Sequence, residues 1–178
     1  SCIVPATGTI DLVLENRVIE ALGRRSLNVW DGEPEGVYVP TGQTAEIICL
    51  SDSCEVFIAG AKFEQTLEPI VIRCTDIDLV QYGSDETKTH RKIKHILGQK
   101  QADKVGRLLV SELYTVGKGG WSGFPPHKHD TNRLPDETRH DEVYNFRFKP
   151  ENGFGMQLLQ PEDGSTGDAF HITNSSSF

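Results

Sequence analysis

Residues 119–148, GGWSGFPPHKHDTNRLPDETRHDEVYNFRF, decide the fold class that we predict for this chain. From Glu142 to Phe148, a carboxylate and three aromatic side chains alternate with other residues, which is typical of one face of a β-strand. Two prolines precede the run that carries His127 and His129, and we expect that run to be extended as well. The polar segment between them contains Pro135, which favours a long loop over a helix. The stretch therefore predicts two β-strands joined by a loop.

Metal-ligating side chains are concentrated on these two predicted strands. In an extended chain His127 and His129 point to one face, and Lys128 points to the other. Glu142 begins the second strand and shares its face with Tyr144. Two imidazoles and one carboxylate suit zinc, manganese, iron, nickel or copper. We predict a divalent metal site at His127, His129 and Glu142, with zinc as the favoured ion and manganese, iron or nickel as alternatives.

Two alternatives to this site stay open. His140 lies two residues before Glu142 on the same face, so these two side chains form a competing pair, with the other histidines as bystanders. A short HKH run is also common on polar surface strands, where Glu142 would simply be solvated.

Composition narrows the classes of partner. The formal net charge is −8, whereas nucleic acids and anionic membranes favour a basic patch, so we expect neither as a partner. No apolar run approaches the roughly 18 residues that cross a bilayer.

The four cysteines form no CxxC pair and follow no secretory signal, so we expect reduced thiols and a cytoplasmic protein. None of them has a neighbouring histidine that would activate it for catalysis.

Residues 1–80 contain short apolar runs bounded by turn residues, which predicts an all-β fold. The predicted strands cover residues 2–5, 9–14, 26–30, 36–40, 45–50, 54–60 and 69–74. This half contains no histidine, so it offers no HxH site. Further along the chain, 107–116 fits either a helical turn or a strand, and GFGMQLLQ and AFHIT predict two more strands.

A polar, locally basic segment separates the two halves, and we expect a connection between domains at residues 81–106. Two interpretations of its basic run, THRKIKHIL, stay open. The cations either form a solvated face, or Arg91 or Lys94 holds the carboxylate of a substrate.

The runs GGWSGFPPHKHD, DEVYNFRF and GFGMQLL closely resemble the 5-deoxy-glucuronate isomerase family of bacterial inositol catabolism. The resemblance implies an all-β double cupin and identifies His127, His129 and Glu142 as three metal ligands. It further implies that strands precede Ser1, and that the fourth ligand comes from a GYHP-like motif beyond Phe178 rather than from His171. The implied domains are a partial N-terminal cupin-like barrel without a metal site at 1–80, the connection at 81–106 and a metal-binding cupin at 107–178.

The resemblance also implies a function in carbohydrate metabolism. The expected activity is a metal-dependent aldose–ketose isomerisation that converts 5-deoxy-glucuronate to 2-deoxy-5-keto-gluconate during myo-inositol catabolism, with a small sugar acid as the substrate. Tyr144 and His140 are the candidate bases for moving the proton. A non-catalytic cupin that binds a sugar acid and a metal-dependent cupin dioxygenase remain alternatives, and the sequence leaves open whether the chain forms a homo-oligomer.

Overall fold

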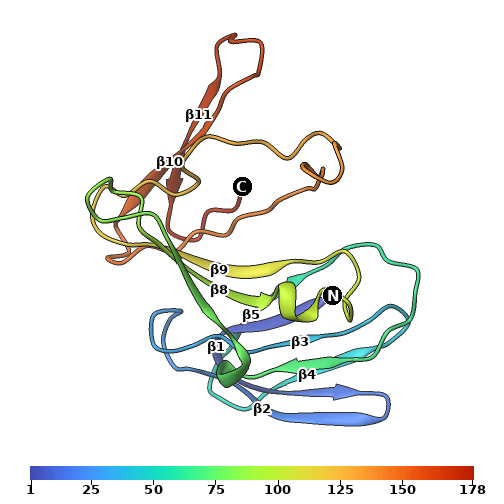
Figure 1. The fold of residues 1–178 in the computed structure, drawn as a ribbon. Coiled ribbons are helices and arrows are strands. Elements are labelled where there is room, and N and C mark those ends of the chain that lie inside the picture. The colour runs from blue at the N-terminus through green and yellow to red at the C-terminus, as the bar shows by residue number, and fades with distance from the viewer. The chain divides into compact units, whose positions relative to one another are not determined.

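Short runs of branched and aromatic side chains fold as antiparallel strands throughout this chain (Figure 1). The structure, a computed structural model, describes residues 1–178. The strands are β1 (Cys2–Leu14), β2 (Arg17–Arg25), β3 (Gly36–Tyr38), β4 (Ala45–Cys49), β5 (Glu55–Ala59), β6 (Ile70–Ile72), β7 (Leu79–Tyr82), β8 (Arg91–Leu97), β9 (Val110–Thr115), β10 (Phe154–Leu159) and β11 (Asp168–Thr173). The helical segments are the 3-10 turns η1 (Cys74–Asp76) and η2 (Gln99–Gln101), and neither has the length and apolar character of a membrane span. The all-β prediction is confirmed.

The chain divides into two compact units, Ser1–Phe124 and Pro125–Phe178, which we call unit 1 and unit 2. In unit 1, strands β2, β1, β3 and β6 lie in that order, β4 and β5 also pair with β1, and β7, β8 and β9 form a second sheet. In unit 2, β10 and β11 form an antiparallel hairpin. The predicted metal ligands all belong to unit 2.

Strand β1 organises unit 1 because it pairs with four neighbours. Its first half pairs with β3 and β5, and its second half pairs with β2 and β4. Apolar side chains of unit 1 form two buried clusters. One consists of Ile3, Ile10, Leu12, Leu14, Ile19, Leu22, Val37 and Val39. The other consists of Cys2, Val4, Tyr38, Ile72, Ile96 and Leu97.

The second cluster includes side chains from the segment that the sequence predicts as a connection. Ile96 and Leu97 on β8 are buried beside Cys2 and Val4 of β1. The segment expected as a connection at 81–106 therefore contains a core strand, and β9, the strand alternative for 107–116, pairs with it inside unit 1.

One local prediction was wrong and one strand was missed, each for an identifiable reason. Residues 26–30 form a turn rather than a strand, because the Asp31 carboxylate accepts hydrogen bonds from the N–H groups of Leu27 and Asn28. Strand β2 was not predicted, because its pairing with β1 contains two register shifts and Ala21 has a positive φ of 49°. These irregularities interrupt the alternation that marks a strand.

A buried carboxylate joins β2 to the connection after β6. Glu35 is 1% exposed and accepts hydrogen bonds from the N–H groups of Gly23 (3.0 Å) and Cys74 (3.4 Å), and from the guanidinium groups of Arg73 (3.1 Å) and Arg24 (3.2 Å). Burial alone would raise the pKa of Glu35. The hydrogen bonds from Gly23, Arg73 and Cys74 outweigh burial and hold this pKa below its ordinary value of 4.5.

The Glu35 cluster predicts a pH-dependent contribution to stability. Because the pKa of Glu35 is lower in the folded than in the unfolded chain, its stabilisation is complete above pH 4.5 and is lost as the pH falls through the folded value. Glu35→Gln should lower the free energy of unfolding by about 2 kcal/mol at pH 7. Urea unfolding of both proteins measures this difference, which should shrink as the solution is acidified. A difference that stays constant with pH would contradict the assignment.

Candidate metal centre

The segment that carries the candidate ligands folds back on itself through backbone hydrogen bonds. The His140 N–H donates to the His129 carbonyl (3.0 Å). Nearer the tip, Arg133 and Glu137 exchange hydrogen bonds of 2.8 and 3.1 Å. The two arms of this loop therefore bring His129, His140 and Glu142 together in unit 2. The predicted strand at HKH does not form, because the two arms share only one isolated bridge, between Arg133 and Glu137.

The second predicted strand, 142–148, is also irregular, yet part of it is paired. Tyr144 exchanges backbone hydrogen bonds of 2.8 and 2.9 Å with Phe178. Its ring lies 5.6 Å from that of Phe146 with an interplanar angle of 23°. Tyr144 and Phe146 thus share a side, as their alternation predicts.

The imidazole rings of His127 and His129 lie close together, as expected for an HxH pair in an extended chain. Their ring centroids lie 5.4 Å apart with an interplanar angle of 46°. With metal–nitrogen bonds of about 2.1 Å, two imidazoles on one tetrahedral ion hold their centroids about 5 Å apart. The spacing of this pair fits two ligands of one ion.

The hydrogen bonds of the imidazoles leave suitable nitrogens for a metal. His127 Nδ1 donates to the Pro125 carbonyl (3.0 Å), and His140 Nδ1 donates to the Thr138 carbonyl (3.1 Å). In a neutral imidazole, a proton on Nδ1 leaves a lone pair on Nε2. His129 Nε2 lies 3.1 Å from Glu142 Oε2, and both side chains are partly exposed. The nitrogen and carboxylate donors fit a divalent transition metal in kind.

His140 occupies a different position from the other two imidazoles. Its ring is stacked on that of His129 with centroids 4.0 Å apart and an interplanar angle of 14°. Parallel rings direct their nitrogen lone pairs side by side rather than toward a common point. This geometry favours His127 over His140 as the second imidazole ligand beside His129.

The three candidate ligands are not arranged around one common point in this structure. No three His, Cys, Asp or Glu side chains of the chain are arranged together as metal ligands. His129 Nε2 and Glu142 Oε2 instead lie 3.1 Å apart, in direct contact with each other. A metal at this position would have to replace that contact and draw in His127.

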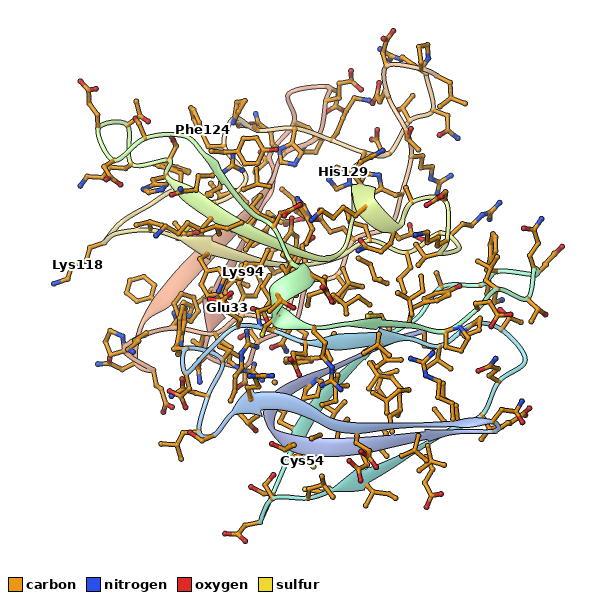
Figure 2. The ribbon with its side chains drawn as sticks, turned by 60° about the horizontal axis from the view of Figure 1, so that its bottom comes forward. Glu33, Cys54, Lys94, Lys118, Phe124 and His129 are labelled. Atoms are coloured by element: carbon orange, nitrogen blue, oxygen red, sulfur yellow. The ribbon has the colours of Figure 1, made fainter.

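The basic candidates for binding a carboxylate lie on β8 in unit 1. Lys94 Nζ pairs with Glu33 at 2.6 Å and lies 4.7 Å from the centre of the Tyr114 ring (Figure 2). Arg91 lies 6.0 Å from the centre of the Tyr82 ring, and its buried Nε has no hydrogen-bond partner. The positive charge of Lys94 is therefore already balanced by the Glu33 carboxylate within the same unit.

His171, which the family resemblance leaves outside the ligand set, lies on β11. Its ring meets the edge of the Phe154 ring, with centroids 5.6 Å apart.

Lys128 has a role that the sequence did not reveal. Its ammonium group contacts Asp130 (3.0 Å), Thr131 (3.0 Å) and Glu137 (3.2 Å), which belong to both arms of the ligand loop. These contacts, with Asp130 first, raise the pKa of Lys128. The acidic residues near HKH in the sequence indicate that Lys128 has carboxylates within reach. Which of them it contacts depends on how the loop folds.

The Lys128 contacts predict an indirect effect on metal binding. Lys128→Met should lower metal affinity about 10-fold, as the loss of an outer contact around a metal site commonly does, because the two arms lose their shared cation. Calorimetric titration with Zn²⁺ measures the affinity. Lys118→Met, an exposed lysine of unit 1 (Figure 2), is the matched control and should leave it unchanged. Equal metal affinities for both variants would show that the contacts of Lys128 with the two arms do not support metal binding.

Comparison with known proteins supports a family assignment. The sequence matches the KduI/IolB family over residues 1–178. It is 31% identical over 174 residues to a 5-deoxy-glucuronate isomerase of Bacillus subtilis (strain 168), an alignment that covers 97% of this chain and 62% of the relative. It is 28% identical over 172 residues to the 5-deoxy-glucuronate isomerase of Listeria monocytogenes serotype 4b (strain F2365), covering 96% of this chain and 61% of the relative. The chain thus spans less than two thirds of the length of these relatives.

A solved structure gives the same result at the level of the fold. The crystal structure of an IolB-like protein from Salmonella typhimurium LT2 superimposes on this chain with a TM-score of 0.86 at 25% identity. The alignment covers 99% of this chain and 65% of the solved chain, in agreement with the predicted double-cupin class. With a family match along the whole sequence and a shared fold, the chain belongs to the KduI/IolB family.

Proposed function

We propose that the chain is an aldose–ketose isomerase that converts 5-deoxy-glucuronate to 2-deoxy-5-keto-gluconate in myo-inositol catabolism. The names of its relatives support the reaction class and the substrate. The observation that carries the proposal is the His127–His129 pair, with ring centroids 5.4 Å apart, beside a carboxylate 3.1 Å from His129 Nε2. Nitrogen and oxygen donors gathered in this way suit the metal that such an isomerase would use.

His127, His129 and Glu142 would hold a divalent metal, with zinc favoured. When bound, the ion supplies Lewis acidity that stabilises negative charge on the carbonyl and hydroxyl oxygens of the substrate. The HxH pair contributes neutral imidazoles and Glu142 contributes a negative charge, so part of the ion's charge remains available for an anionic sugar acid.

The proton transfer needs a base within this unit. The reaction removes a proton from the carbon beside the aldehyde, passes through an enediol and delivers a proton to the former aldehyde carbon. His140 is the better candidate, because its Nδ1 donates to the Thr138 carbonyl and Nε2 keeps a lone pair that accepts a proton. Tyr144 is the weaker candidate, because its ring is stacked against Phe146.

Turnover in deuterated water tests this chemistry. Proton NMR of 5-deoxy-glucuronate with the protein should show ketose that carries deuterium at the carbon that receives the proton. Ketose without deuterium would instead indicate internal hydrogen transfer, and an absence of ketose would remove the isomerase assignment in favour of a sugar-acid-binding cupin.

Substitution of the base gives a separate prediction. His140→Phe keeps an aromatic ring against His129 but removes the proton acceptor, so it should retain metal while kcat falls by about 100-fold or more. Tyr144→Phe, which removes only a hydroxyl, is the comparison and should have a smaller effect. If kcat falls for Tyr144→Phe and not for His140→Phe, the two roles are reversed.

A further inference from the structure

Two cysteines lie at the ends of neighbouring strands in unit 1, away from the histidines in the sequence. Cys49 ends β4, and Cys54 immediately precedes β5. Both strands pair with β1, where Ile10 lies opposite Cys49 and Thr7 lies opposite Glu55. Strands β4 and β5 therefore run in the same direction along β1, and the short connection 50–53 bulges out opposite Gly8 and Thr9 with one cysteine at each end.

The connection is held tightly against β1. Leu50 N–H donates to the Thr9 carbonyl (2.8 Å), and Thr9 N–H donates to Ser51 Oγ (3.0 Å). Ser51 Oγ in turn donates to the Ser53 carbonyl (3.0 Å). A Cβ added at Gly8, whose φ is +78°, would lie 2.7 Å from the Cys54 Cβ, so the close approach requires a glycine there.

The two thiols are accessible and lie at the two ends of the connection 50–53. Cys49 is exposed and Cys54 is partly exposed. The neighbouring Cys54 thiol lowers the pKa of Cys49, and the Cys49 sulfur raises that of Cys54. Cys49 Sγ lies 3.9 Å from Ser51 Oγ, and both Ser51 Oγ and the Cys54 Cβ would touch a Cβ added at Gly8. Cys49 Sγ also contacts the Ser51 carbonyl (3.2 Å). By contrast, burial raises the pKa of the Cys2 thiol to about 12.

We propose that Cys49 and Cys54 form a redox-active dithiol that closes to a disulfide by exchange with a low-molecular-weight disulfide such as glutathione disulfide. The Cys49 thiolate attacks one sulfur of glutathione disulfide, forms a mixed disulfide and releases one glutathione thiolate. The Cys54 thiol then loses its proton and attacks the Cys49 sulfur, which releases the second glutathione. Two protein thiols are oxidised, and one disulfide is reduced to two thiols.

The closed ring would join the end of β4 to the start of β5 and fix the connection over Gly8. This exchange uses no residue of the candidate metal centre, so it is independent of the proposed isomerase activity. The protein would thereby carry a thiol pair that responds to the ratio of oxidised to reduced glutathione.

Titration of the protein with glutathione disulfide tests the proposal. The wild-type chain should lose two of its four thiols, gain no glutathione in its intact mass, and yield a peptide that links Cys49 to Cys54. Excess reduced dithiothreitol should restore all four thiols. Peptide mapping of the wild type needs no variant, so it decides the pairing even if a substitution disturbs folding.

Variants resolve the order of the steps. Cys54→Ser should stop at a stable mixed disulfide on Cys49, and Cys49→Ser should react more slowly than the wild type. Cys74→Ser, in which a partly buried cysteine on η1 is replaced, is the matched control and should form the same ring as the wild type. A mixed disulfide that persists in the wild type, or a linked peptide that contains Cys74, would overturn the proposal.

Discussion

Replacing His129 by alanine should lower Zn²⁺ affinity by more than about 100-fold and reduce isomerase turnover by at least the same factor. His129 is central in the candidate metal centre, because it contacts His127 and His140 through its ring and Glu142 through Nε2. Loss of a contact outside the ligand set commonly costs 10 to about 100-fold in metal affinity, so loss of a ligand should exceed this range. Calorimetric titration and elemental analysis of the purified protein measure affinity and content.

The matched control for this substitution is His95→Ala in unit 1. His95 lies on β8, and its Nδ1 is within 2.7 Å of Ser111 Oγ. This variant removes one imidazole from the chain without touching the ligand loop, so both metal affinity and turnover should match those of the wild type. Unchanged metal occupancy in the His129 variant would exclude His129 from the site.

Replacing Arg25 by alanine should lower the free energy of unfolding by about 3–5 kcal/mol, because it leaves a partly buried carboxylate without its cation. Arg25 is 2% exposed, and its two terminal nitrogens donate to the two carboxylate oxygens of Glu112 at 2.7 and 2.6 Å. The Tyr114 hydroxyl donates to the same carboxylate at 2.6 Å. Urea unfolding followed by tryptophan fluorescence measures the loss, since Trp30 packs edge-on against Tyr114.

The neighbouring arginine provides the control. Arg24 has a side chain that is 68% exposed and makes one ion pair, with Glu35 at 3.2 Å. The Arg24 guanidinium lies largely in water, and without it Glu35 keeps its hydrogen bonds from Gly23, Arg73 and Cys74. This ion pair should therefore contribute less than about 1 kcal/mol, and Arg24→Ala should be nearly neutral. Similar losses of unfolding free energy for the Arg25 and Arg24 variants would show that burial of the Arg25–Glu112 pair does not determine how much it stabilises the fold.

Sequence patterns predicted the fold class well where strands are short and regular. The runs at β3, β4, β5 and β6 combine branched side chains with flanking turn residues, and each predicted range contains the observed strand. Patterns failed where a side chain or a bulge replaces the regular backbone pairing, as at Asp31 and in β2. They also failed for β8, because its burial depends on contact with the distant β1.

The candidate site was predictable only in part. The spacing of His127 and His129 brings their rings together even though the backbone there is not a strand, because residues two apart in an extended segment point to one side. The stacking of His140 on His129 and the contacts of Lys128 depend on hydrogen bonds across a long loop. No local pattern specifies which residues face each other across such a loop.

Turnover that a chelator stops and a divalent ion restores would tie isomerase activity to the candidate metal centre. Proton NMR should follow the conversion of 5-deoxy-glucuronate to 2-deoxy-5-keto-gluconate by the metal-replete protein, by the same protein after removal of divalent metal, and after Zn²⁺ or Mn²⁺ is restored. Conversion should stop when the metal is removed and return with one equivalent of the ion. Conversion at the same rate by the metal-free protein, or no conversion by the metal-replete protein, would contradict the proposed metal-dependent isomerisation.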